Sequence, residues 1–292
     1  TPAYDPVVRR TIRGANIRPS VLARPAADSR GRDLPLSTDL MLGLPGSTPE
    51  TFRADLQRAI DAEVHVRTPP AQLLVTSPMN AAEYRSEHGI TAQPGDLVTS
   101  TTTFTEVEWR QMMRTRQLFY FAERRGMLRQ LATYVRAETG TPEMECYDHL
   151  RVLAETSPDH PHLASVLRVA AVSYLPPGDW TPLLEEVGAV MVDDLGVPDD
   201  DALRSVLWAQ LALFLTGGRA FPATVELAHD VVAWHREVVA AKLAHPDGSY
   251  AGEYGSRNTY HFYPHGFELL AGESADALGI CELYLRKGLP FA

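Results

Sequence analysis

Between positions 38 and 52 the sequence is Thr38-Asp-Leu-Met-Leu-Gly-Leu-Pro-Gly-Ser-Thr-Pro-Glu-Thr-Phe52. The apolar run from Leu40 to Leu42 is bounded by turn residues and predicts a short buried strand. The glycines of the loop at 43–46 allow a sharp turn, and Thr48 can cap a helix that begins with Pro49. This stretch is therefore predicted to form a strand, a tight loop and a helix.

A second unit of the same kind is predicted to follow. Residues 65–67 and 72–75 are strand candidates, bent between them by Pro69-Pro70, and residues 81–88 have the pattern of a short helix that ends at Gly89. Two successive strand and helix units predict crossover connections and a parallel sheet.

The sequence changes character near residue 100. A threonine-rich connector at 99–105 ends in a predicted capping box of Thr105 with Glu108, and helical periodicity then continues to about residue 244. Breaks at 126, 140–142, 158–161, 176–178, 196–198 and 217–218 predict six or seven helices. We therefore predict an α/β fold followed by mostly α structure, with domains at 1–100 and 101–292. The second domain is predicted to be mainly helical and to carry an aromatic-rich loop at 245–273.

Composition excludes several classes of protein. The 292 residues are 45% hydrophobic, enough to bury a core, and the longest apolar run, 206–215, is too short to cross a bilayer. The net charge is -10 and the acidic excess lies in residues 101–292, which disfavours nucleic acid as a partner. Two cysteines and no signal-peptide pattern predict a cytoplasmic protein without membrane contact.

The order of these parts carries a family resemblance. Residues 5–14, the stretch 39–52, and the segments 73–79 and 87–90 together resemble the late part of a radical S-adenosylmethionine barrel. The resemblance is strongest to the cobalamin-binding branch of that superfamily and covers roughly residues 1 to 105. It implies the last βα units of a partial (β/α) barrel, and it implies S-adenosylmethionine, a [4Fe-4S] cluster and cobalamin as cofactors of the intact enzyme.

The same resemblance implies site residues. Met41, two positions before the first loop glycine, would pack near the adenine of S-adenosylmethionine, and Gly43, Leu44 and Pro45 would shape that wall. Many members of the superfamily have a small residue two positions before the adenine contact, where this chain has Asp39. They also have an acid just beyond the loop, where this chain has Gly46 or Ser47. The candidate contacts to a small-molecule substrate are Ser77, Met79, Tyr260 and Tyr263. No catalytic residue is assigned.

The cluster ligands are missing from this chain. The superfamily holds its cluster with three cysteines in a CxxxCxxC loop, whereas Cys146 and Cys281 stand far apart with no near companion. We therefore expect the chain alone to be inactive and its partner to be the missing N-terminal half of the barrel. Because the sequence begins with Thr1, a truncation or a fragmentary gene model is expected.

Three functions follow from these features. The first is a fragment of a cobalamin-dependent radical S-adenosylmethionine enzyme that performs radical methylation, or related C–H chemistry, on a small metabolite. The alternative is a non-catalytic helical interaction protein that retains a barrel remnant. The third is a metal-dependent enzyme that uses His261 and His265, although Pro264 and the lack of further ligands in sequence argue against a metal site.

Overall fold

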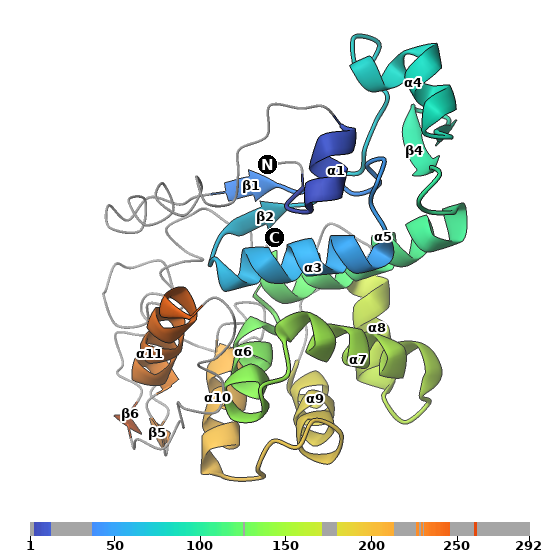
Figure 1. The fold of residues 1–292 in the computed structure, drawn as a ribbon. Helices are drawn as coiled ribbons and strands as arrows, with labels where there is room; N and C mark the ends of the chain where they lie inside the picture. Colours follow the sequence, from blue (N-terminus) through green and yellow to red (C-terminus); the bar gives the residue numbers. More distant parts are fainter. Residues whose placement is uncertain are drawn as a thin grey trace. The chain divides into compact units, whose positions relative to one another are not determined.

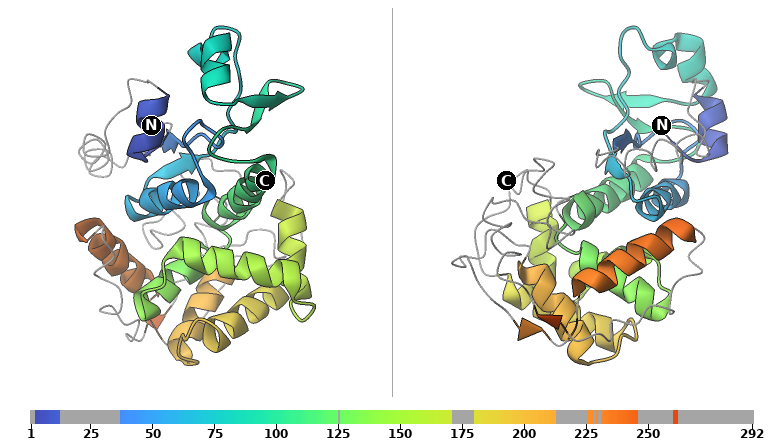
Figure 2. Two further views of the ribbon diagram at one scale, coloured as in Figure 1. Left: turned by 45° about the vertical axis from the view of Figure 1, so that its right-hand side comes forward. Right: turned by 90° about the vertical axis from the view of Figure 1, so that its left-hand side faces the viewer.

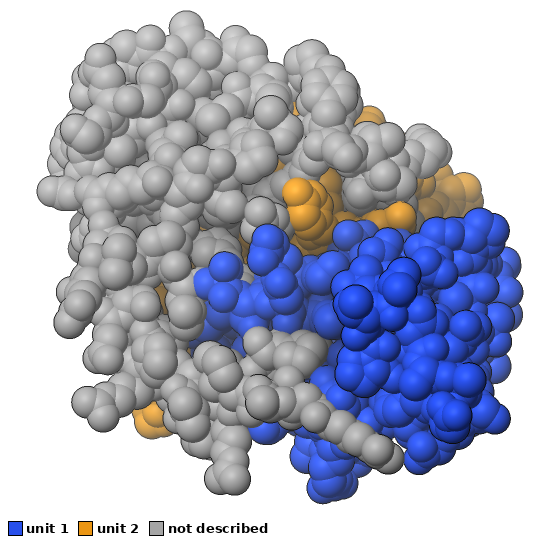
Figure 3. Space-filling view, turned by 90° about the horizontal axis from the view of Figure 1, so that it is seen from above, with its two compact units in different colours: residues 1–116 blue, residues 117–292 orange. Residues whose placement is uncertain are grey.

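The computed structural model is mostly helical, with a few short strands (Figure 1, Figure 2). It divides into unit 1, residues 1–116, and unit 2, residues 117–292 (Figure 3). Helix α5 (Glu106–Phe119) runs through the division. The structure describes residues 3–12, 37–124, 126–170, 180–212, 226–227, 229, 231–245 and 260–261.

Unit 1 contains one parallel strand pair. Strand β1 (Ser37–Asp39) pairs with β2 (His65–Arg67), and helix α3 (Pro49–Asp61) connects them. Asp39 lies opposite Arg67, which donates two hydrogen bonds to its carboxylate at 2.7 and 3.1 Å. The predicted loop and helix are thus confirmed, whereas β1 begins at Ser37 and ends just before the apolar run at 40–42 from which the strand was predicted.

The pairing continues through the two prolines. Leu42 N–H donates to the Pro69 carbonyl at 3.0 Å, and Ala71 N–H donates to the Leu42 carbonyl at 2.8 Å. Proline lacks an N–H, but this ladder needs from Pro69 only an acceptor, so the strand is not interrupted. Leu40 and Leu42, which belong to this ladder, are both buried.

The predicted second parallel strand at 72–75 is wrong. Leu73 N–H donates to Asp96 at 2.8 Å and Val98 N–H donates to Ala71 at 3.0 Å, so this segment runs antiparallel to β4 (Leu97–Ser100). Strand β4 forms a hairpin with β3 (Thr91–Gln93), where a connector was predicted to begin at Thr99. In the described part of unit 1, β1 and β2 are the parallel pair, and a barrel is not seen.

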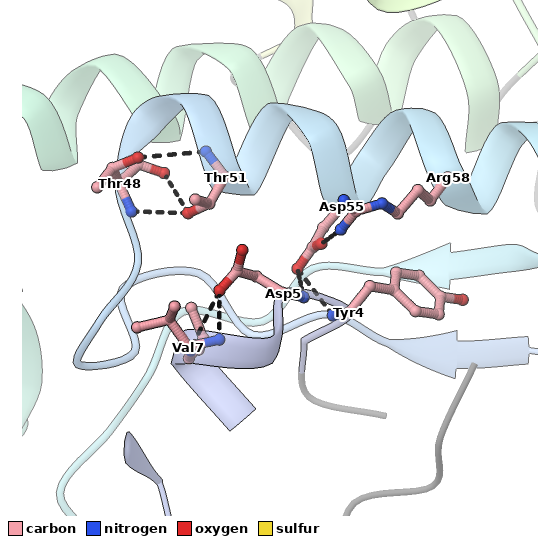
Figure 4. A network of polar contacts seen from close by, with 8 residues as sticks. Tyr4, Asp5, Val7, Thr48, Thr51, Asp55 and Arg58 are labelled. Carbon is pink, nitrogen blue, oxygen red and sulfur yellow. Dashed lines mark hydrogen bonds and ion pairs between the residues drawn. The ribbon is translucent and has the colours of Figure 1, made fainter. Parts of the chain in front are cut away.

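Unit 1 also contains short helices. The predicted helix at 81–88 is α4 (Ala82–Glu87), which follows the 3-10 helix η1 (Pro78–Asn80). Helix α1 (Pro6–Thr11) is capped by Asp5, whose side chain accepts from Val7 N–H at 2.8 Å (Figure 4).

Asp55 of α3 holds the N-terminal segment. Its buried carboxylate accepts from the backbone N–H groups of Tyr4 at 2.8 Å and Asp5 at 3.4 Å, and Arg58 lies 2.9 Å away (Figure 4). Burial raises the pKa of Asp55, although these three partners favour its charged form. The reciprocal bonds between Thr48 and Thr51 confirm Thr48 as the cap of the same helix (Figure 4).

Unit 2 is a set of helices in which chain neighbours pack on one another, and α10 also packs on α6 and α11. Including α5, the described residues between 106 and 244 form seven α-helices, as predicted. The further elements are η2 (a π-helix, Tyr120–Arg124), α6 (Arg129–Thr139), α7 (Glu143–Thr156), α8 (Pro161–Ala170), α9 (Thr181–Asp193), α10 (Asp201–Ala212), β5 (Glu226–Leu227), α11 (Val231–Ala244) and β6 (Tyr260–His261).

Several predicted breaks are confirmed. Gly126, Gly140 and Gly196 have φ values of 68°, 81° and 73°, which end helices where the sequence indicates. The breaks predicted at 176–178 and 217–218 lie outside the described residues, as does most of the aromatic-rich loop at 245–273. Across the described chain, every helix falls short of the length and apolarity that a bilayer crossing requires.

A carboxylate from α9 caps α8. Glu186 accepts from the backbone N–H groups of His162 at 3.0 Å and Leu163 at 2.8 Å, and its carboxylate lies 2.6 Å from His162 Nδ1. Burial opposes the charge on Glu186, but these bonds outweigh it and lower its pKa below 4.5. The contact therefore joins two helices through an ionised group.

We predict that Glu186→Gln lowers the free energy of unfolding by about 1 kcal/mol at neutral pH, as for loss of a helix cap. Because the folded-state pKa is depressed, this contribution is fully present above pH 4.5 and is lost as the pH falls through the lowered pKa. Urea unfolding at several pH values measures it. Glu185→Gln, at an exposed neighbour, is the control, and equal stabilities of the two variants at neutral pH would contradict the cap.

Candidate functional site

The candidate site is the loop that leaves the carboxyl end of β1. Gly43, Leu44 and Pro45 are buried, and Met41 is partly exposed just before them. Gly43 and Gly46 have φ values of 84° and 91°, a backbone that favours glycine. Ligands of parallel sheets bind at this end of the strands, so the loop occupies the expected position.

Both glycines lie in close contact with other elements of unit 1. A Cβ on Gly43 would lie 3.5 Å from Trp109 Cδ1, at the start of α5. A Cβ on Gly46 would lie 3.1 Å from Thr11 Oγ1 and 3.3 Å from Val8 Cα, both in α1. The loop therefore depends on glycine for its backbone angle at both positions, and for space at Gly46.

Trp109 adds a polar group beside this loop. Its indole Nε1 is buried and, within the part of the chain that the structure describes, has no hydrogen-bond partner. Nε1 lies 3.6 Å from the position of a Cβ on Gly43. Buried donors are nearly always bonded to protein, water or ligand, so this N–H lacks the partner that such groups normally have.

Trp109 was not among the site residues proposed from the sequence. The residue is 66 positions beyond Gly43, and no local pattern links the two. The helix that carries it was visible, because Thr105 and Glu108 form the predicted capping box with bonds of 2.7, 2.9 and 3.3 Å.

The predicted substrate contacts are only partly described. Ser77 accepts from Met79 N–H at 3.3 Å and so caps η1 in unit 1. Tyr260 lies in β6 of unit 2, where its backbone pairs with Leu227, and Tyr263 lies outside the described residues. Their convergence on one substrate stays a prediction.

The histidine and cysteine side chains were considered as possible metal ligands. Among the described residues, no group of three or more His, Cys, Asp or Glu side chains is placed to hold a metal ion. His261 pairs through its backbone with Glu226, and His265 lies outside the described residues. Burial, with Glu143 nearby, raises the pKa of Cys146 to about 12, which disfavours the thiolate that metal ligation needs.

A second cluster of titratable groups lies inside unit 2, in and beside the π-helix η2. Tyr147 donates to Glu123 at 2.5 Å, and Arg129 Nε lies 3.5 Å from the other oxygen of that carboxylate. Burial raises the pKa of Glu123, while Arg129 and Tyr147 favour its charged form. Both π-helices and shifted pKa values are common at functional sites.

The cluster continues to Glu143, the first residue of α7. This carboxylate is 0% exposed and lies 2.6 Å from Arg136 of α6 and 2.8 Å from Lys242 of α11. One anion thus joins three helices through two buried cations. Since these groups satisfy one another, we interpret the cluster as a structural link in the core of unit 2.

The chain was also compared with known proteins. No protein-family model matches it, and no curated protein is significantly similar to it. The functional interpretation therefore depends on the residues and geometry described above.

We predict that Glu143→Gln destabilises the protein by about 3 kcal/mol, because the two buried cations lose their shared carboxylate. Urea unfolding followed by tryptophan fluorescence measures the change. The control is Glu155→Gln, which removes a carboxylate 3.0 Å from Arg151 at the surface of α7. That variant should differ from the wild type by less than about 0.5 kcal/mol, and a similarly small effect at Glu143 would contradict the structural link.

Proposed function

We propose that the loop from Gly43 to Ser47, together with Met41 and Trp109, binds the adenosine portion of S-adenosylmethionine. The observation that carries this proposal is the buried indole N–H of Trp109, which lies beside the left-handed Gly43 and has no hydrogen-bond partner among the described residues. Adenine ring nitrogens and ribose oxygens are acceptors that would satisfy this donor.

The surroundings of the loop fit a flat nucleoside. Met41 offers a partly exposed apolar side chain, and Gly43, Leu44 and Pro45 present a wall without bulky polar groups. Small-molecule sites combine such apolar walls with a few placed polar groups. The role of these residues is to hold and orient the nucleoside.

The wider proposal is that the chain is the C-terminal portion of a cobalamin-dependent radical S-adenosylmethionine enzyme acting on a small metabolite. The parallel unit of β1, α3 and β2 supports it, since βα units of this kind build a (β/α) barrel. When bound beside its cluster, S-adenosylmethionine supplies the radical chemistry. Ser77, Met79, Tyr260 and Tyr263 remain the proposed substrate contacts.

The residues of this chain do not fit the [4Fe-4S] cluster. Three thiolates are required, and the sequence contains two cysteines, of which Cys146 is buried with a raised pKa. The cluster ligands, and the half of the barrel that carries them, would come from another part of the enzyme. No described residue is assigned to cobalamin.

We predict that S-adenosylhomocysteine binds to this chain with millimolar affinity and perturbs Trp109. In protein labelled with 5-fluorotryptophan, the ¹⁹F resonance that disappears in Trp109→Phe should shift on titration, because its indole N–H gains an acceptor. Met41→Asp should weaken binding about tenfold or more by placing a charge in the apolar wall.

The control for Met41→Asp is Val75→Asp, since Val75 is 91% exposed in the same unit and its replacement should leave binding unchanged. A Trp109 resonance that does not respond to millimolar ligand would overturn the nucleoside site. It would favour the alternative function, a non-catalytic helical interaction protein.

A further inference from the structure

The second half of the loop is bonded to one threonine. Thr103 Oγ1 donates to the Ser47 carbonyl at 2.7 Å and accepts from the Gly46 N–H at 3.2 Å. A single hydroxyl group therefore contacts two successive residues of the loop through their backbones. Thr103 lies 56 positions after Ser47, in the turn that precedes α5.

A second threonine completes this arrangement. Thr101 Oγ1 accepts from the Thr103 N–H at 3.1 Å and also lies 3.1 Å from Thr103 Oγ1. Because the one hydroxyl proton of Thr103 is used on Ser47, Thr101 must donate to Thr103. The hydrogen bonds then run in one direction, from Thr101 to Thr103 to Ser47, and Thr103 Oγ1 accepts from two donors.

The turn that carries both threonines is itself well fixed. Thr101 N–H donates to the Phe104 carbonyl at 3.0 Å, and Thr102 N–H donates to the His88 carbonyl at 2.8 Å. Phe104 is buried in unit 1. These backbone hydrogen bonds and the buried Phe104 fix the turn, so the hydroxyl of Thr103 is held against the loop although Thr103 itself is exposed.

We propose that Thr103 is a positioning residue of the nucleoside site. A loop with two glycines has many accessible conformations, and ordering it on binding would reduce affinity. By bonding Gly46 and Ser47, Thr103 holds the loop in the form that presents Gly43, Leu44 and Pro45 to the ligand. The inference rests on the proposed function, and it adds a residue that does not touch the ligand.

Thr103→Val tests this inference, because valine keeps the shape of threonine and removes the hydroxyl group. S-adenosylhomocysteine should bind about threefold to tenfold more weakly, as for the loss of one or two hydrogen bonds. The Gly46 amide should exchange its hydrogen faster, because its acceptor is lost. Thr103→Ser keeps the hydroxyl and should restore both properties.

Thr102→Val is the matched control, since Thr102 is the exposed neighbour in the same turn and no hydrogen bond of its hydroxyl is seen in the described structure. It should behave as the wild type in binding and in Gly46 exchange. Thr101→Val should weaken binding less than Thr103→Val, and it tests the same bonds if Thr103→Val fails to fold.

The outcomes separate the two proposals. If the wild type binds S-adenosylhomocysteine and folded Thr103→Val binds it equally well, the positioning role is overturned while the nucleoside site stands. If the wild type does not bind it, the proposed function is overturned. Weaker binding with faster Gly46 exchange, reversed by Thr103→Ser, supports both.

Discussion

The left-handed backbone at Gly43 and Gly46 turns the chain from β1 into α3, and residues of α1 and α5 lie directly against that turn. Trp109 packs on Gly43 and α1 packs on Gly46. A Cβ would make an ordinary contact at Gly43 but would be crowded by Thr11 and Val8 at Gly46. The turn therefore sets the backbone direction and also which elements can lie against it. A substitution at Gly43 would be strained by its backbone angle, and a substitution at Gly46 would meet both a strained backbone angle and the crowding by α1.

Local signals in the sequence were sufficient for this turn but not for what surrounds it. Thr48, Pro49 and the apolar run at 40–42 act within a few residues, so the strand, loop and cap were predictable. The segment 72–75 was placed in a parallel sheet because an apolar run does not reveal the direction of its partner. The Pro94-Gly95-Asp96 turn, with φ values of 90° and 60° at its last two residues, signals the hairpin that pairs with it.

The candidate site shows the same limit. The resemblance pointed to residues 41–45, which are contiguous, whereas Trp109 and Thr103 reach the loop from positions about 60 residues later and follow from tertiary contacts alone. In unit 2, periodicity predicted the helices but not the burial of Glu143 and Lys242, because charged residues usually lie at the surface. Such buried pairs contribute less to net stability than to fixing how helices meet.

The proposed cofactors require different kinds of binding residues from this chain. A nucleoside needs a narrow apolar wall and a free donor, which a backbone loop and one indole can supply. The iron-sulfur cluster of this superfamily needs three thiolates close together, and the described cysteine lies where burial and Glu143 disfavour its thiolate. If the chain belongs to a radical enzyme, the redox chemistry and the nucleoside recognition must be divided between separate parts of it. The loop held by Thr103 then serves orientation, because Gly43, Leu44 and Pro45 carry no acidic, basic or redox-active side chain.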